Sequence, residues 1–233
     1  MDYRRAETFL EGTVLMIDKP KGWTSFDVVN KIRRILRSAL DIEKIKVGHA
    51  GTLDPLATGL VIICTGKATK SIAEYQELEK VYSARIRLGA TTPSFDLETE
   101  VDATFPWQHI SREQVEHALV KFTGEQDQIP PLYSAKSVDG KRAYDLARKG
   151  KQVELKPQRI VISQLKLHSF RSPDLEIEVH CSKGTYIRSL ARDLGKELGS
   201  GAHLTDLRRT RIGPYSVTES LTIEKFTEKI ELL

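Results

Sequence analysis

The sequence predicts an α/β or α+β fold, in which helices flank a mixed, largely antiparallel sheet. Alternating apolar and polar residues, which are typical of strands with one exposed face, occur at 81–88 and 175–181. A continuous apolar run at 60–64 is typical of a strand that is buried on both faces. Helical spacing separates these segments, and half-exposed strands interleaved with helices favour a mixed sheet over a purely parallel one.

The N-terminal elements are expected in the order strand, turn, helix and strand. Residues 13–17 have the composition of a short strand, and a turn follows at 19–22. Ser25 is a suitable N-cap for the next helix. The buried strand at 60–64 comes after it. The apolar face of the helix consists of Val28, Val29, Ile32, Ile35 and Leu36.

The remaining elements alternate between strand and helix. The strand at 81–88 places Tyr82 on its apolar side. Ser111, followed three residues later by Gln114, is a capping box that begins a helix. The later elements are expected to be this helix to Phe122, closed by Gly124, a strand at 175–181, and a helix from Ile187 to Leu198, stopped by the glycines at 199 and 201.

Length and composition are those of a globular chain without membrane segments. It has 233 residues, of which 39% are hydrophobic and 29% are charged. The longest apolar run, 60–64, is far shorter than the roughly 20 residues of a membrane span, and no apolar segment follows the N-terminus as in a signal peptide. Cys64 and Cys181 are too few for a disulfide framework and are expected to be small buried side chains. We expect a cytoplasmic protein.

Positive charge is unevenly distributed, although the net charge is only +4. Two stretches, 19–46 and 136–159, each contain eight Lys or Arg against three acidic residues. In contrast, 91–129 contains eight acidic residues against two basic ones. Segregated positive charge is what a surface that binds a polyanion requires. A solvated helix face is the alternative explanation for each cluster.

The segment at 126–150 does not have the features of a core. Pro130 and Pro131 impose an extended backbone near its start. Tyr133 and Tyr144 lie among lysines and arginines. Rings interleaved with cations suit unpaired bases, because the bases stack on the rings while the phosphates contact the cations. The alternative is a basic surface hairpin.

Several kinds of catalytic site are excluded because their motifs are missing. The sequence contains no nucleotide-binding P-loop, no Gly-x-Ser-x-Gly, no His-Glu-x-x-His and no Gly-x-Gly-x-x-Gly. Its six histidines show no metal-ligand spacing. The residues therefore offer no basis for redox chemistry that depends on a cofactor.

A glycine-rich loop at 47–59 is the remaining candidate for a catalytic site. Its three glycines allow tight turns and a close approach to a ligand. Asp54 lies in this loop, directly before Pro55. By spacing alone, this pair also suits a helix N-cap with proline at the first helical position.

This loop resembles the catalytic loop of the tRNA pseudouridine-55 synthases of the bacterial TruB type. Further motifs of that family occur in the same order between about residues 12 and 215, which is most of the chain. So many ordered matches make the resemblance specific. The motifs are Asp18–Ser25, Lys80–Tyr82 with Leu88–Gly89, Pro130–Lys136, Cys181–Arg188, and Gly201–His203 with Leu207–Arg209.

The resemblance implies the pseudouridine-synthase fold and an isomerase that modifies tRNA. In this family the N1–C1′ bond of one uridine in the T-loop breaks and C1′ is rejoined to C5, without cofactor, metal ion or energy source. The target base must leave its stack, at a cost of a few kcal/mol. The expected partner is the T-arm of tRNA, and family members generally act as monomers.

The resemblance also assigns site residues. Asp54 matches the essential aspartate, which acts on the sugar as nucleophile or base. Arg188 matches an arginine that pairs with it and favours its ionised form. Tyr82 matches a tyrosine that packs against the uracil. The expected substrate-binding residues are Tyr186 and Leu207 in the pocket, His49 and Asp96 as RNA contacts, and Lys19 and Lys70 as phosphate contacts.

The resemblance implies that residues 1–233 form a single catalytic domain with an RNA-binding insertion at about 124–152. Many family members continue past residues 221–223 into a PUA domain that binds the acceptor stem, whereas this chain ends at Leu233, so we expect no PUA domain. Two other functions stay open: a related synthase that modifies a different uridine, in ribosomal or guide-directed RNA, and a noncatalytic RNA-binding protein with the same fold.

Overall fold

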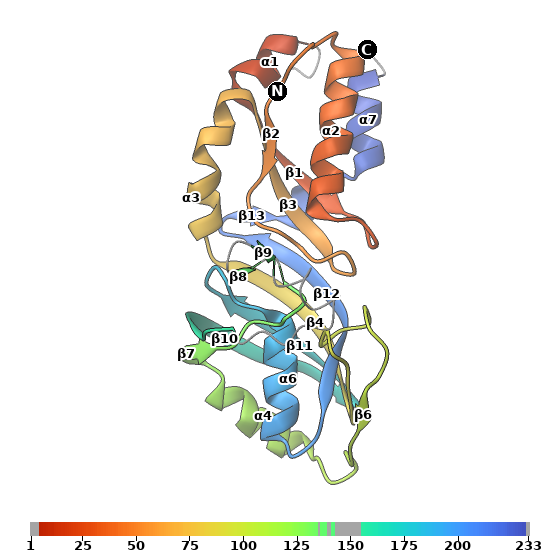
Figure 1. Cartoon of the computed structure of the whole chain (residues 1–233), viewed down its shortest axis with the longest axis vertical. Coiled ribbons are helices and arrows are strands. Elements are labelled where there is room, and N and C mark those ends of the chain that lie inside the picture. The colour runs from red at the N-terminus through yellow and green to blue at the C-terminus, as the bar shows by residue number, and fades with distance from the viewer. Residues whose placement is uncertain (1–4, 135, 139–140, 143–154, 232–233) are drawn as a thin grey trace. The chain divides into compact units, whose positions relative to one another are not determined.

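The structure is a computed structural model that describes residues 5–134, 136–138, 141–142 and 155–231, and its elements belong to two units (Figure 1). The first unit contains the described residues up to Tyr82 and from Arg208 onward, and the second contains Ser83–Leu207. The boundary falls inside β4 (Lys80–Leu88) and β12 (Ala202–Ile212), so each of these strands contributes to both units. Much of the predicted RNA-binding insertion, namely 135, 139–140 and 143–154, lies outside the described residues.

In the first unit, β3 (Thr58–Thr65) is the central strand. β1 (Val14–Lys19) and β2 (Val47–His49) pair with it antiparallel, and the C-terminal part of β12 pairs with it in parallel. β3 is buried from Gly59 to its end, which confirms the prediction of a strand buried on both faces. The other elements are α1 (Ala6–Gly12), α2 (Ser25–Ala39), the 3-10 helix η1 (Gly66–Ser71), α3 (Ile72–Glu77), β13 (Tyr215–Ser216), the 3-10 helix η2 (Val217–Glu219) and α7 (Ile223–Glu231).

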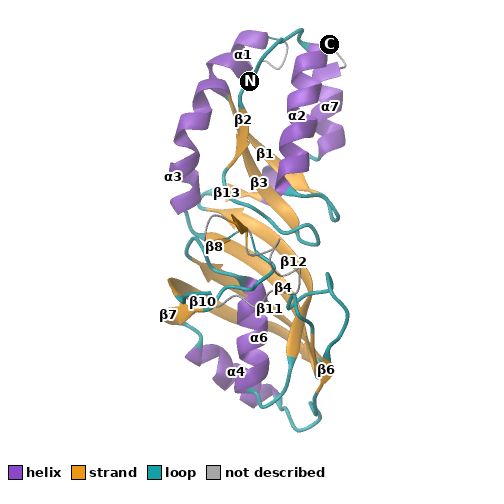
Figure 2. Cartoon of the chain, viewed as in Figure 1, coloured by secondary structure: helices purple, strands orange, loops and turns teal. Residues whose placement is uncertain are grey.

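Helices cover β3 from both sides. Leu60, Ile62 and Cys64 point to one face, where they pack with residues of η1 and α3. Val61 and Ile63 alternate with them and are fully buried on the opposite face. α2 packs against α7 and β2. Figure 2 shows α3 on one side of β1 and β3, and the α2–α7 pair on the other.

α2 is amphipathic as predicted, but its N-cap is Thr24 rather than Ser25. Thr24 Oγ1 accepts a hydrogen bond from the Asp27 amide at 3.0 Å, and the Asp27 carboxylate accepts one from the Thr24 amide at 2.8 Å. This is a complete capping box, which needs a side chain that accepts a hydrogen bond three positions after the cap; Asp27 occupies that position after Thr24, whereas Val28 occupies it after Ser25. Ser25 is the first helical residue, and its hydroxyl bonds elsewhere.

In the second unit the strand order is β12–β4–β11–β10–β7. β10 (Gln158–Arg171) pairs antiparallel with both β11 (Asp174–Cys181) and β7 (Gly124–Gln128). Together with the parallel pair in the first unit, this confirms a mixed, largely antiparallel sheet. The remaining elements are β5 (Ala90–Thr91), β6 (Ala103–Thr104), α4 (Arg112–Lys121), β8 (Ser137–Val138), β9 (Lys141–Arg142) and α6 (Ile187–Glu197).

The predicted patterns of this unit are largely confirmed. β4 alternates between exposed and buried residues from Ser83 onward. The capping box of α4 is present, but the helix ends at Lys121 rather than Phe122, and Gly124, with φ 105°, already begins β7. Both cysteines of the chain, Cys64 and Cys181, are buried, as expected. Across the described ranges, no helix is long and apolar enough to cross a membrane.

Candidate active site

Asp54 lies in an irregular loop that joins β2 to β3 in the first unit. The loop contains a turn in which the Ala57 amide donates to the Asp54 carbonyl at 3.1 Å, and no helix follows. The interpretation of Asp54–Pro55 as a helix start is therefore wrong. Four residues after Asp54 the chain enters β3, which leaves room for one turn only. The Asp54 side chain is half-buried.

Arg209, on β12, holds the start of this loop. Its side chain is 1% exposed, and its Nε donates to the Leu60 carbonyl at 2.7 Å. Its Nη2 and Nη1 donate to the carbonyls of Gly51 at 3.2 Å and Thr52 at 3.4 Å. One buried guanidinium thus ties three backbone carbonyls of the loop and of β3 to the neighbouring strand. This arrangement fixes the backbone on both sides of Asp54.

Glycine at position 59 allows the close approach that this requires. Gly59 has φ 107°, and a Cβ on it would lie 2.3 Å from the Arg209 carbonyl oxygen. No side chain can occupy that space, so any other residue would push β3 away from β12.

The first residue of α2 fixes the residue that precedes Asp54. Ser25 Oγ accepts from the Leu53 amide at 2.8 Å and is also 3.3 Å from the Leu53 carbonyl oxygen, to which it donates. Both residues are buried. The N-terminal end of α2 therefore supports the candidate catalytic loop directly.

Lys19, at the end of β1, fixes the residue that follows Asp54. Its ammonium donates to the carbonyls of Pro20 at 3.0 Å, Trp23 at 2.6 Å and Pro55 at 3.3 Å. Burial lowers the pKa of Lys19 to about 8; the negative charge of Asp54 opposes this shift, and Arg209 adds to it. Lys19 is fully buried, which favours a role in holding the loop. The phosphate contact assigned to it above stays a prediction.

His49 and Lys70 occupy different environments in the first unit. His49 lies on β2, two residues before Gly51, and burial together with the positive charge of Arg209 lowers its pKa, so the neutral imidazole is favoured. Lys70 lies at the end of η1 and is exposed. Tyr82 lies on β4 and is buried. Their assignments in RNA binding and catalysis stay predictions.

Arg188 and Asp96 are brought together in the second unit. Arg188 lies in the first turn of α6, is 3% exposed, and donates to the carbonyls of Ser94 at 3.2 Å and Tyr133 at 2.8 Å. Its Nε lies 3.7 Å from the Asp96 carboxylate, which also accepts from the Glu98 amide at 2.9 Å. The loop around Asp96 thus orients the guanidinium. The pairing of Arg188 with Asp54 stays a prediction.

Tyr186 and Leu207 are the remaining predicted site residues of this unit. Gln128, at the end of β7, binds both backbone groups of Tyr186: its Oε1 accepts from the Tyr186 amide at 2.8 Å, and its Nε2 donates to the Tyr186 carbonyl at 3.1 Å. Because Tyr186 is the N-cap of α6, this amide contact fixes the start of the helix that carries Arg188. Leu207 is buried on β12.

Three residues that shape the site, Arg209, Gln128 and Ser25, were assigned no role at this site from the sequence. Arg209 was detectable, because the period of two along β12 places its side chain on the same face as the buried Leu207. Gln128 and Ser25 were not, since their contacts join segments that are 58 and 28 residues apart in the chain.

Two solved structures share the fold of this chain. One is entitled "Crystal Structure of a Cbf5-Nop10-Gar1 Complex", with TM-score 0.73 and 28% identity; this chain is covered to 97% and spans 56% of that chain. Another, an H/ACA RNP bound to a substrate RNA containing 2′-deoxyuridine, has TM-score 0.70 and 26% identity, with 97% of this chain and 55% of that chain covered. This chain thus spans little more than half of those proteins.

The family comparisons define the class as pseudouridylate synthase. Residues 33–187 match "TruB family pseudouridylate synthase (N terminal domain)", and residues 188–232 match "tRNA pseudouridylate synthase B C-terminal domain". The chain belongs to the TruB family. This membership confirms the predicted family, the pseudouridine-synthase fold, and an isomerase that acts on RNA.

Curated relatives agree over nearly their whole length. A protein of Phocaeicola vulgatus named tRNA pseudouridine synthase B is 60% identical over 223 residues, which are 96% of this chain and 95% of that protein. Its namesake in Bacteroides fragilis is 58% identical, with 96% of each covered. The one in Flavobacterium johnsoniae is 49% identical, with 97% of this chain and 99% of that protein covered.

Proposed function

We propose that this protein converts uridine 55 in the T-loop of tRNA to pseudouridine, with Asp54 as the essential carboxylate. The observation that supports the role of Asp54 is that side chains from three other elements hold its loop in place. The residue before it is bound by Ser25, the residue after it by Lys19, and the start of the loop by Arg209. A carboxylate on a backbone held at so many points is positioned before the substrate arrives, as a catalytic group requires.

The reaction is an isomerisation, so its atoms balance within the substrate. The N1–C1′ bond breaks, C1′ bonds to C5, and the C5 proton leaves while N1 gains one. Asp54 acts in its ionised form, either as nucleophile at C1′ or as a base toward the sugar. Tyr82 and Arg188 are proposed to assist it, and Tyr186, Leu207, His49, Asp96, Lys19 and Lys70 to bind the substrate, as the family resemblance implies.

The proposed substrate is the T-arm of tRNA, bound by one copy of the protein in the cytoplasm. The relatives named tRNA pseudouridine synthase B support tRNA as the RNA. The basic stretch at 136–159 suits phosphate binding. A single catalytic domain over residues 1–233 stays part of this proposal.

The test is tritium release from transcribed tRNA that carries 5-tritiated uridine, without added metal or cofactor. The parent protein should release tritium, and Asp54→Asn should not, although it should bind tRNA with nearly the parental affinity. Release by Asp54→Asn at the parental rate would show that another group carries the reaction. Mapping the modified position separates uridine 55 from a different uridine, and tight binding without release by the parent would indicate a noncatalytic RNA-binding protein.

A further inference from the structure

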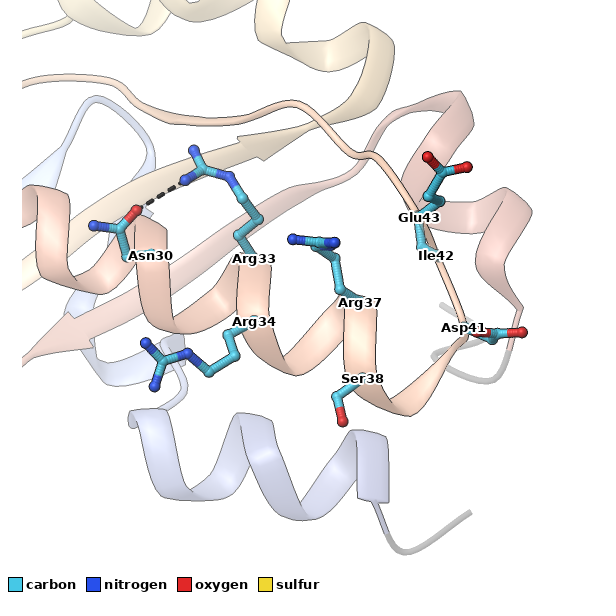
Figure 3. A pocket seen from close by; sticks show the side chains of 8 residues that line it. All are labelled: Asn30, Arg33, Arg34, Arg37, Ser38, Asp41, Ile42 and Glu43. Atoms are coloured by element: carbon cyan, nitrogen blue, oxygen red, sulfur yellow. Dashed lines mark hydrogen bonds between the residues drawn. The ribbon is translucent and has the colours of Figure 1, made fainter.

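α2 carries a cluster of arginines that the candidate active site does not use. They line an open pocket of about 790 Å³ on the C-terminal half of this helix and on the segment that follows it (Figure 3). The lining residues are Asn30, Arg33, Arg34, Arg37, Ser38, Asp41, Ile42 and Glu43. All of them belong to the first of the two stretches in which the sequence concentrates positive charge.

The three guanidinium groups differ in how they are held: Arg33 is fixed by hydrogen bonds, whereas Arg34 and Arg37 are exposed. Arg33 is fixed, because it donates to Asn30 Oδ1 at 2.8 Å and to the Val47 carbonyl at 3.1 Å. Arg34 and Arg37 are exposed, and neither forms an ion pair with any residue that the structure describes. Exposed guanidinium groups without an ion pair keep their donors available for a phosphate, which they bind with charge-assisted hydrogen bonds.

Two acidic residues at the rim limit what the pocket can hold. The Glu43 carboxylate lies 3.6 Å from the Lys44 ammonium, so its charge is partly compensated. In Figure 3 the carboxylates of Asp41 and Glu43 point away from the guanidinium of Arg37. The acidic side chains therefore disfavour an anion at the Asp41 end of the pocket, whereas the end lined by the three arginines remains positive.

The pocket and the Asp54 loop lie at opposite ends of the same helix. Ser25, the first residue of α2, bonds to Leu53. Arg33 and Arg37 follow Ser25 by eight and twelve residues, which places them roughly 12 and 18 Å further along the helix axis at 1.5 Å per residue. An RNA with its target uridine at Asp54 extends over that distance with only a few nucleotides.

We propose that Arg33, Arg34 and Arg37 form a second RNA-binding site, which holds backbone phosphates of the substrate at a fixed distance from the target uridine. The proposal rests on the proposed function for the identity of the ligand as RNA. Phosphates fit because the site offers charge and donors but no aromatic platform for bases. Such contacts position the RNA without reading its sequence.

The test is equilibrium binding of transcribed tRNA to the full chain over a range of salt concentrations. Arg34→Gln/Arg37→Gln should weaken binding on the order of tenfold, and should make the slope of log K against log salt shallower by roughly 0.7–0.9 for each lost phosphate contact. Arg34→Lys/Arg37→Lys should restore most of the slope, since lysine still supplies a charge. Asp41→Asn should strengthen binding, and its left-handed backbone, with φ 49°, suits asparagine.

The matched control is Arg171→Gln/Arg211→Gln, which removes two exposed arginines outside the pocket and changes the net charge equally. An equal loss of affinity in both double variants would mean that net charge alone acts and would overturn the proposal. So would an unchanged salt slope in Arg34→Gln/Arg37→Gln. Because binding and tritium release are separate readouts, failure of the proposed catalysis would be seen independently, as absence of tritium release by the parent.

Discussion

At the scale of single residues, Lys19 is a charged group enclosed by the backbone that it organises. Its three carbonyl partners belong to the turn after β1 and to the residue after Asp54. Carbonyl dipoles offset part of the cost of burying the ammonium, and burial still lowers its pKa to about 8. Lys19 thus couples the stability of the first unit to the geometry of the candidate catalytic loop.

Because its pKa is lowered in the folded protein, Lys19 should make the free energy of unfolding depend on pH. Lys19 has a pKa of about 8 in the folded protein and an ordinary value of 10.5, so this group binds more protons in the unfolded chain between these values, and its contribution to stability rises with pH in that window. The gain should be about 3 kcal/mol. Lys19→Met should lack this rise, which denaturant unfolding across the window measures for both proteins. Parallel profiles would contradict the assignment.

Asp96 allows a test between two roles, because the structure places its carboxylate beside Arg188 whereas the family resemblance predicts an RNA contact. If Asp96 orients Arg188, Asp96→Asn should lower kcat of tritium release and leave KM near the parental value. Removing the counter-charge of a buried guanidinium should also cost about 3 kcal/mol of stability. Asp102→Asn, in the same segment, is the control and should change neither constant. A raised KM with unchanged kcat would favour the RNA contact.

At the scale of elements, the parallel contact between β12 and β3 depends on two positions. Arg208 pairs with Thr58 and Arg209 with Gly59. The contact is short, yet it delivers the guanidinium of Arg209 to the loop that carries Asp54. If the pairing of β12 with β3 shifted by one residue, the Arg209 side chain would lie on the opposite face of the sheet.

Gly59→Ala should therefore be strongly destabilising. The new Cβ meets the Arg209 carbonyl at 2.3 Å, and φ 107° is itself unfavourable for alanine. Gly22→Ala is the matched control, because Gly22 also has a positive φ, of 83°, but nothing lies within 4 Å of its Cβ position. We expect Gly22→Ala to cost about 1–2 kcal/mol and Gly59→Ala at least about 2 kcal/mol more. Thermal and denaturant unfolding measure both, and equal losses would show that the close contact is unimportant.

At the scale of the whole molecule, the proposed reaction is an isomerisation of the substrate and needs no other reactant. The protein should therefore retain activity after dialysis against EDTA. The assay uses tRNA that is folded beforehand in monovalent salt, so that loss of magnesium does not unfold the substrate. Tritium release within twofold of the untreated protein is expected. Loss of activity that returns with a metal ion, while the tRNA fold is unchanged, would contradict the expectation that no metal takes part.

Much of this molecule could be predicted from local sequence. The buried strand at 60–64, the alternation of β4 and the capping box at Ser111 follow from periodicity and short-range hydrogen bonding. The position of Asp54 could be assigned only through the family resemblance, because Asp-Pro alone also suits a helix start. The contacts that hold its loop could not be predicted, since they pair side chains with backbone carbonyls far along the chain, and carbonyls carry no sequence signature.

The two buried thiols have a practical consequence for spectroscopy. Cys64 lies under the first unit's helices, and burial raises the pKa of its thiol to about 11, while Cys181 is 1% exposed. Alkylating reagents attack exposed thiolates, so neither sulfur competes for a maleimide dye in the native state. A single cysteine introduced at the exposed position of Lys70 would carry the only fluorophore, and the natural chain needs no prior removal of cysteines for such labelling.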